Sequence, residues 1–469
     1  MNEKTEKLVA KDIFALKKML KEEQITAGNL FEVFKMVIEN VNPKVNAIVD
    51  KRYEQALEEA KQYDETGEKE NLGKLAGVPI TIKELFDVQH MQTTGGLLHR
   101  EGLLAKYDAE VVKRLKNEGA IIIGKTNTPE LSFCQETDNK LYGRTNNPRD
   151  LTKTVGGSSG GEAAAIASGM AAAGIGSDIG GSIRFPSHFT GVIGFKSGRD
   201  QVSAQHSFPE AAHPLQERML GIGPLTKSVR DARLLYEIIA NHEVSPTDLK
   251  EFTINILPKT NLPLSRRTSK LLTQVYKACR EDYLVERKIP PYFHQSAVLW
   301  QKMMSIEGGK MAGAHFNGNV IGEYVKEKLF KNSSHHRYLS WALIGAKLFE
   351  PSSKELEKMT ETIEAGDKFL DAYLDKRILA FPVYHSPAPN HGKVYSEIFS
   401  IRKTFKKYMP YIAYANVWGL PSLTIPIGEN RAGLPIAIQL MSKNGNEDAL
   451  FQLGERLEKV FLGYQLARV

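Results

Sequence analysis

The segment between residues 156 and 194 constrains this chain more than any other. It holds eleven glycines in 39 residues, and glycine is the residue that allows left-handed backbone or close approach to another group. Packing alone rarely requires such a density, so we look for chemistry here. Two glycine-rich runs, at 155–162 and 174–184, flank an alanine-rich stretch that predicts a helix.

Helical and strand patterns alternate in the first half of the chain. Apolar spacing predicts helices over 8–20, 30–38, 53–63 and 109–117. Residues 77–83 are rich in β-branched side chains and predict a short strand that ends at Lys83, and 120–124 have the length and apolarity of a buried parallel strand. This alternation predicts an α/β core.

The second half predicts a lobe followed by the rest of the sheet. Longer helical patterns fill about 245–380, and strand-like runs return at 378–384, 422–427 and 435–441 before a final helix at 447–460. We therefore expect one domain over residues 1–469, with N-terminal helices over about 1–60 and a helical, substrate-facing lobe at about 245–380. We expect these late strands to complete the same sheet.

Composition excludes several classes of protein. With 42% hydrophobic and 25% charged residues the chain is globular, and its net charge of +7 is spread out, so no nucleic-acid partner is expected. The two cysteines are too few for a disulfide framework or a sulfur-ligated zinc site. A charged N-terminus without a following apolar stretch predicts no secretory signal and a cytoplasmic location. The uncharged stretches 163–177 and 408–428 are too short or too rich in proline to predict a transmembrane helix.

Several chemistries compete for the glycine-rich segment. A phosphate-binding loop would need Gly-Lys-Ser/Thr, which is absent, and the glycine spacing does not fit a dinucleotide fingerprint. Residues 156–160 match G-x-S-x-G, but a turn rather than a strand precedes them. The remaining hypothesis is a serine nucleophile at Ser182, where Gly180 and Gly181 let backbone N–H groups converge as an oxyanion hole. The base would be a lysine, which these residues alone do not identify.

Residues 77–83 and 156–196 together resemble the amidase signature family of Ser-Ser-Lys amide hydrolases. Further familial segments lie at 42–47, 124–130, 419–422 and 433–435. Residues 139–148 joined to 155–162 are particularly similar to the type 2 fatty acid amide hydrolases. We expect no N-terminal membrane segment of the kind that those enzymes carry, and the resemblance is weaker between about 203 and 380.

The resemblance implies a role for each matching residue. Ser182 would be the nucleophile, Ser158 a bridging serine held by a cis peptide, and Lys83 the base. The backbone amides of Ile179, Gly180, Gly181 and Ser182 would form the oxyanion hole. The implied fold is a single α/β/α domain around a large mixed central sheet. We predict no metal or organic cofactor.

The leading hypothesis is an enzyme that hydrolyses a linear carboxylic amide through an acyl-serine intermediate. Its substrate is a small-molecule amide, and the lobe could give a preference for fatty or other apolar acyl groups. The alternative is a glutamine-hydrolysing subunit of a tRNA-dependent amidotransferase. A monomer or homodimer that is active alone would favour the hydrolase. A noncatalytic binding protein is disfavoured, because all three reactive positions are filled.

Overall fold

A single mixed sheet organises the computed structural model, which describes residues 2–66, 73–211, 213–400 and 402–469. Within these residues eleven strands pair in the order β1-β3-β2-β4-β6-β5-β10-β11-β9-β7-β8. The strands are β1 (Ile48–Lys51), β2 (Pro79–Lys83), β3 (Ile121–Thr126), β4 (Ala173–Asp178), β5 (Ile193–Lys196), β6 (Gly221–Thr226), β7 (Thr253–Ile256), β8 (Leu284–Glu286), β9 (Arg377–Pro382), β10 (Ser422–Glu429) and β11 (Pro435–Met441). The pair β2–β3 and the pair β2–β4 are parallel, whereas the central strands from β4 to β9 pair antiparallel.

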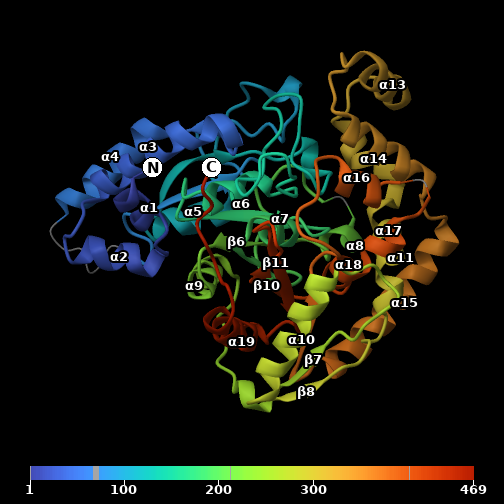
Figure 1. The fold of residues 1–469 in the computed structure, drawn as a ribbon. Helices are drawn as coiled ribbons and strands as arrows, with labels where there is room; N and C mark the ends of the chain where they lie inside the picture. The colour runs from blue at the N-terminus through green and yellow to red at the C-terminus, as the bar shows by residue number, and fades with distance from the viewer. Residues whose placement is uncertain (1, 67–72, 212, 401) are drawn as a thin grey trace.

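Helices surround this sheet. They are α1 (Glu3–Val9), α2 (Ile13–Lys21), α3 (Ala27–Val45), α4 (Tyr53–Glu65), α5 (Glu110–Asn117), α6 (Gly160–Ala167), α7 (Arg184–Thr190), α8 (Pro214–Glu217), α9 (Val229–Ile239), α10 (Arg266–Arg280), α11 (Phe293–Met304), α12 (Lys310–Ala314), α13 (Val320–Phe330), α14 (Arg337–Leu348), α15 (Ser353–Tyr373), α16 (Lys393–Ile398), α17 (Phe405–Tyr408), α18 (Pro410–Val417) and α19 (Glu447–Val460). In Figure 1, α1 to α4 lie at one end of the molecule, and α11 and α13 to α15 lie at the other.

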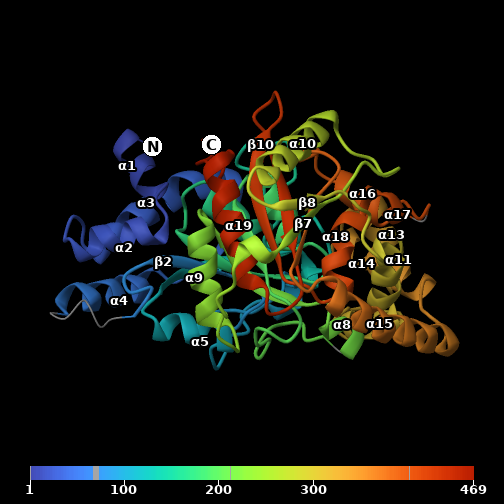
Figure 2. The ribbon, with the colours of Figure 1, turned by 90° about the horizontal axis from the view of Figure 1, so that it is seen from below.

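Both faces of the central sheet are covered. Every residue of β2, β3, β4 and β11 is buried, which requires side chains on each face to pack against other elements. Helices α9 and α19 lie side by side in Figure 2 and contact β6 and β10, while α7 contacts β10 and β11. The mixed α/β fold with a large sheet is therefore confirmed.

The strands predicted late in the sequence join the same sheet as the early ones. Strands β9, β10 and β11 match the predicted runs, and α19 has the predicted bounds. Two strands, β7 and β8, lie inside the range 245–380, which is therefore not purely helical. The prediction of one helix over 8–20 was wrong, because α1 ends at Val9 and α2 begins at Ile13. Asp12 is the N-cap of α2: its side chain accepts a hydrogen bond from Ala15 N and so satisfies an otherwise unpaired amide.

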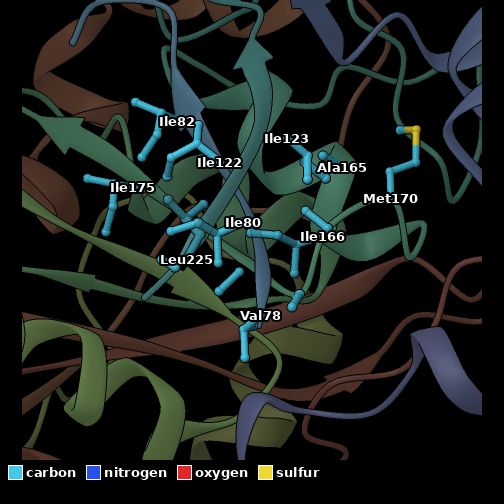
Figure 3. Packing of buried hydrophobic residues seen from close by; sticks show 14 of the residues in the cluster. Val78, Ile80, Ile82, Ile122, Ile123, Ala165, Ile166, Met170, Ile175 and Leu225 are labelled. Atoms are coloured by element: carbon cyan, nitrogen blue, oxygen red, sulfur yellow. The ribbon is translucent and has the colours of Figure 1, made fainter. Parts of the chain in front are cut away.

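The core beside the glycine-rich segment is built by the parallel strands. Figure 3 shows Ile80 of β2 between Ile175 of β4 on one side and Ile166 of α6 on the other, with Ile122 of β3 close by, and all four are fully buried. Burying a side chain of this size contributes roughly 1.5 to 3 kcal/mol, so the ends of β2 and β4 are held firmly. In the described part of the chain, no helix is long and apolar enough to cross a membrane.

Candidate active site

The parallel pairing of β2 with β4 places Lys83 beside the second glycine-rich run. Ile82 pairs with Ile175, so Lys83 at the carboxyl end of β2 lies beside the end of β4. The carboxyl ends of parallel strands meet at one edge of a sheet, which is where α/β proteins commonly place their sites. The Lys83 side chain is fully buried.

The Lys83 amine lies against two serine hydroxyls. Its Nζ is 2.6 Å from Ser158 Oγ and 3.1 Å from Ser177 Oγ. Ser158 follows a cis peptide bond from Gly157, and α6 begins at Gly160. These contacts join the strand end to the first glycine-rich run.

Ser182 lies in the loop between β4 and α7. The carbonyl of Ser182 accepts a hydrogen bond from Ser159 N at 3.0 Å, which ties the two glycine-rich runs together. Gly181 has φ +97°, a left-handed conformation, and a Cβ there would lie 2.6 Å from the Phe185 ring. Only glycine fits such a position without strain.

A buried ion pair fixes the loop between β4 and α7. Asp178 Oδ2 accepts from Arg184 Nε at 2.9 Å, and both side chains are fully buried. The same carboxylate accepts from the backbone N–H groups of Gly181 and Ile183. Asn416 of α18 bonds both partners. Burial alone would raise the pKa of Asp178, but the Arg184 charge and hydrogen bonds outweigh it and hold that pKa well below its usual range.

Replacing Asp178 with asparagine is expected to lower the free energy of unfolding by about 3 to 5 kcal/mol, because it leaves the Arg184 charge buried without a partner. Denaturant unfolding of the two proteins measures the loss. Arg468→Ala is the control, because Arg468 is 83% exposed in its ion pair with Glu6, and exposed pairs contribute about 0 to 1 kcal/mol. Equal stability of Asp178→Asn and wild type would contradict the structural role of the pair.

Burial sets the protonation of Lys83. It lowers the pKa of Lys83 to about 7, although the charges of Asp178 and Glu162 act in the opposite direction. Glu162 bonds the Thr81 and Thr126 hydroxyls. Burial raises the pKa of Glu162 to about 8. Glu162 is therefore mostly neutral near pH 7, and a substantial fraction of Lys83 is a free amine that can accept a proton.

Ser182 opens onto a cavity of about 190 Å³ that also reaches the lobe. Its walls are mostly apolar and include Leu131, Phe133, Trp300, Trp341, Ile344 and Phe349. Ile179 and Gln135 line the end near Ser182. An apolar cavity with a few polar groups at one end is typical of a small-molecule site.

The structure places Lys83 Nζ against Ser158 Oγ and ties the loop that carries Ser182 to the first glycine-rich run, but one of the four amides expected in the oxyanion hole is already engaged. Gly181 N–H donates to Asp178 Oδ1 at 2.8 Å, so it is engaged rather than free, whereas the amides of Ile179, Gly180 and Ser182 have no protein partner among the described residues. Cys134 is buried and also lines the cavity.

Sequence reasoning missed Ser177, Glu162 and Gln135 as parts of this site. Ser177 contacts the Lys83 amine, Glu162 lies close enough to affect the charge of that amine, and Gln135 lines the cavity. One signal was available for Ser177 and Glu162, because both stand in the glycine-rich runs, Ser177 within 174–184 and Glu162 at the end of 155–162. Nothing local marked Gln135.

The chain is similar to known proteins over most of its length. The family model "Amidase" matches residues 29–451. The chain is 30% identical to fatty-acid amide hydrolase 2 of Homo sapiens, with 98% of this chain and 91% of that protein covered. It is 30% identical to indoleacetamide hydrolase of Bradyrhizobium diazoefficiens, over 89% of this chain and 80% of that protein. A solved structure of 6-aminohexanoate cyclic dimer hydrolase has the same fold, with TM-score 0.80 and 21% identity over 98% of this chain and 100% of that one. This chain belongs to the amidase family.

Proposed function

We propose that the protein hydrolyses linear carboxylic amides, with Ser182 as nucleophile and Lys83 and Ser158 as a proton relay. The observation that carries the proposal is the fully buried Lys83 amine, 2.6 Å from Ser158 Oγ, beside the loop that presents Ser182 to the cavity. The long amidase match supports the same reaction class.

The first half of the reaction forms an acyl-serine. Neutral Lys83 accepts the Ser158 proton while Ser158 accepts the Ser182 proton, and Ser182 Oγ bonds to the carbonyl carbon. The carbonyl oxygen becomes an anion, and the free N–H groups of Ile179, Gly180 and Ser182 stabilise it. When the C–N bond breaks, the leaving nitrogen takes a proton back through the same relay.

The second half releases the acid. Water gives a proton to the Ser158–Lys83 pair and attacks the acyl-Ser182 carbonyl. The ester bond then breaks and Ser182 recovers its proton. Proton transfer by a positioned base contributes about 10²-fold to 10⁴-fold, so loss of the relay should impair both halves. A serine-directed fluorophosphonate that labels wild-type protein at Ser182 tests the nucleophile directly, and labelling elsewhere would refute it.

We propose that the lobe at about 245–380 makes the cavity select apolar acyl groups. Trp300, Trp341 and Phe349 come from this range and line the cavity. Each methylene buried from water contributes about 0.8 kcal/mol. For a series of acyl p-nitroanilides, kcat/KM is therefore expected to rise by up to about fourfold per methylene until the cavity is full. A flat or falling series would contradict an apolar acyl site.

Replacing Gly345 with leucine is expected to shorten the longest acyl chain that the enzyme accepts. Gly345 lines the cavity on α14, and a Cβ there would meet no atom within 4 Å. A leucine would extend into that space, so kcat/KM should fall at least about tenfold for chains that fill the cavity, since two or more methylenes lose their contacts. Hydrolysis of acetyl and propionyl anilides should stay within about twofold of wild type. Their short acyl chains lack the methylenes that the leucine displaces, each of which contributes about 0.8 kcal/mol.

Gly313→Leu is the matched control for this experiment. Gly313 also stands in a helix, α12, with open space around it, but it is not among the cavity-lining residues. It should leave the chain-length profile unchanged. The same truncated profile in both variants, or in neither, would contradict the assignment of the lobe cavity to the acyl chain.

The glutamine-hydrolysing alternative fits the cavity less well. Glutamine carries an α-ammonium and an α-carboxylate, which need charged or polar partners when they leave water. Among the described lining residues the charged side chains are Glu210, Glu307 and Lys310, and most of the wall is apolar. Ammonia release from glutamine by the purified chain, faster than cleavage of apolar amides, would favour the alternative.

A further inference from the structure

The loop that supplies the oxyanion-hole amides is held by two side chains from outside it. Trp300 Nε1 donates to the Ile179 carbonyl at 2.9 Å, and Gln135 Nε2 donates to the Gly180 carbonyl at 3.2 Å. Two successive carbonyls of the loop are thus each fixed by a side-chain donor. Trp300 belongs to α11 of the lobe, whereas Gln135 precedes α6, so the two residues hold the loop from different parts of the fold.

A hydrogen bond that fixes a backbone carbonyl also fixes the direction of the N–H group in the same peptide unit. A peptide unit is planar and trans, so its C=O and N–H point in opposite directions. The unit that joins Ile179 to Gly180 therefore directs Gly180 N–H away from Trp300. That N–H has no protein partner among the described residues and is available to a substrate oxygen.

The next peptide unit is fixed at both of its polar groups. Its carbonyl, on Gly180, accepts from Gln135, and its N–H, on Gly181, donates to Asp178. Because Gly180 and Gly181 lack a Cβ, little intrinsic preference opposes rotation of these units. External hydrogen bonds must therefore set their orientation.

Trp300 also restricts the loop by contact. A Cβ at Gly180 would lie 2.7 Å from Trp300 Cζ2, so the indole packs directly against the glycine backbone. Trp300 is only 6% exposed. Trp300 therefore both donates a hydrogen bond to the peptide unit between Ile179 and Gly180 and packs against it.

We infer that Trp300 and Gln135 are positioning residues that orient the oxyanion-hole amides, so that the lobe contributes to transition-state stabilisation as well as to substrate binding. The inference rests on the proposed hydrolase function. A preorganised hole is valuable because its dipoles need not reorient as charge develops. Loss of either hydrogen bond leaves the amides present but free to turn, which weakens binding of the anion more than binding of the neutral amide.

The test separates these two kinds of binding. We would prepare Trp300→Phe, which retains an aromatic ring but loses the N–H, and Gln135→Leu, which is close in size but has no donor. Removing a whole oxyanion donor costs about 10²-fold to 10³-fold in kcat, so a misaligned donor should cost about 10-fold to 10²-fold with KM changed less than threefold.

Two inhibitors provide the decisive readout. A trifluoromethyl ketone adds to the serine and forms an oxyanion, whereas the corresponding alcohol binds without one. The Ki of the ketone should rise by the same factor as kcat falls, and the Ki of the alcohol should stay within threefold of the wild-type value. A simple packing defect in the cavity would weaken both inhibitors alike and would overturn the inference.

Trp418→Phe is the matched control. Trp418 Nε1 donates to Ser296 Oγ at 3.1 Å, and Ser296 lies on α11 like Trp300. This variant removes an indole hydrogen bond to the same helix without contacting the loop. It should retain wild-type kcat and ketone affinity, and a loss equal to that of Trp300→Phe would assign the effect to α11 as a whole.

The proposed function and this inference can fail separately. Wild-type protein that neither reacts with a fluorophosphonate nor binds the ketone would refute the proposed function itself. Wild-type protein that does both, together with Trp300→Phe and Gln135→Leu variants that keep full kcat and ketone affinity, would refute the positioning role alone. Because Trp300 lies on α11 and Gln135 lies in the loop before α6, misfolding of one variant leaves the other as a test.

Discussion

Ser182→Ala is expected to reduce kcat for amide hydrolysis by about 10⁴-fold or more, since loss of a serine nucleophile removes the covalent route and leaves only binding and the oxyanion hole. The methyl group of alanine fits wherever the Ser182 Cβ lies, so the fold should be retained. Substrate should still bind, because the cavity walls are unchanged. Single-turnover assays with an acyl p-nitroanilide, with labelling by a fluorophosphonate, measure both losses together.

Ser168→Ala is a suitable control for this experiment. Ser168 is fully buried, and its hydroxyl donates to Ala164 O at the end of α6, but it does not line the cavity. Its replacement should leave kcat within about twofold, because it removes one hydrogen bond of about 1 kcal/mol from the fold rather than a reacting group. Ser182→Ala protein with full activity would exclude the proposed nucleophile.

Lys83→Met is expected to reduce kcat/KM by about 10³-fold or more, because a thioether of similar length fills the site but cannot accept the Ser158 proton. The wild-type enzyme should also report this group in its pH dependence. Burial lowers the pKa of Lys83 to about 7, and the neutral amine is the active form. The kcat/KM value should therefore rise about tenfold per pH unit below 7 and level off above it. An increase in kcat/KM towards acid pH would contradict the base role.

Lys227→Met is the matched control for the buried amine. Burial lowers the pKa of Lys227 to about 7 as well, but its Nζ bonds the Val9 carbonyl near the N-terminal helices. Its replacement can change stability but should not change kcat/KM of the folded protein or its pH profile. If Lys227→Met lowered kcat/KM as Lys83→Met does, or changed its pH profile, the pH dependence would reflect folding rather than catalysis.

The strands could be predicted, and candidate reactive residues could be proposed, because their signals are local. The β-branched run that ends at Lys83 and the apolar run of β3 each show their burial within five or six residues. Ser158 and Ser182 stand in glycine-rich runs whose density is rare. These features need no knowledge of distant contacts.

Other features depended on contacts between distant parts of the chain. Gln135 and Trp300 are 165 positions apart in the sequence, yet they hold adjacent carbonyls of one loop. The break between α1 and α2 depended instead on a local feature, the Asp12 N-cap, which the apolar spacing of residues 8–20 did not reveal. Strands β7 and β8 are only four and three residues long, too short for a periodic pattern to distinguish them within a helical region.

The sequence by itself indicated the family and the alternation of strands and helices, and through the family resemblance it gave Lys83, Ser158 and Ser182 as the candidate reactive residues. Only the tertiary structure decided that Lys83 is cut off from water beside Ser158, that Gly181 N–H is held by Asp178, and that Trp300 lies against Gly180. The physical reason is that side-chain type and local spacing are properties of neighbouring residues. The charge of a buried amine and the direction of a peptide unit are set by groups that meet only when the sheet and the lobe have packed together.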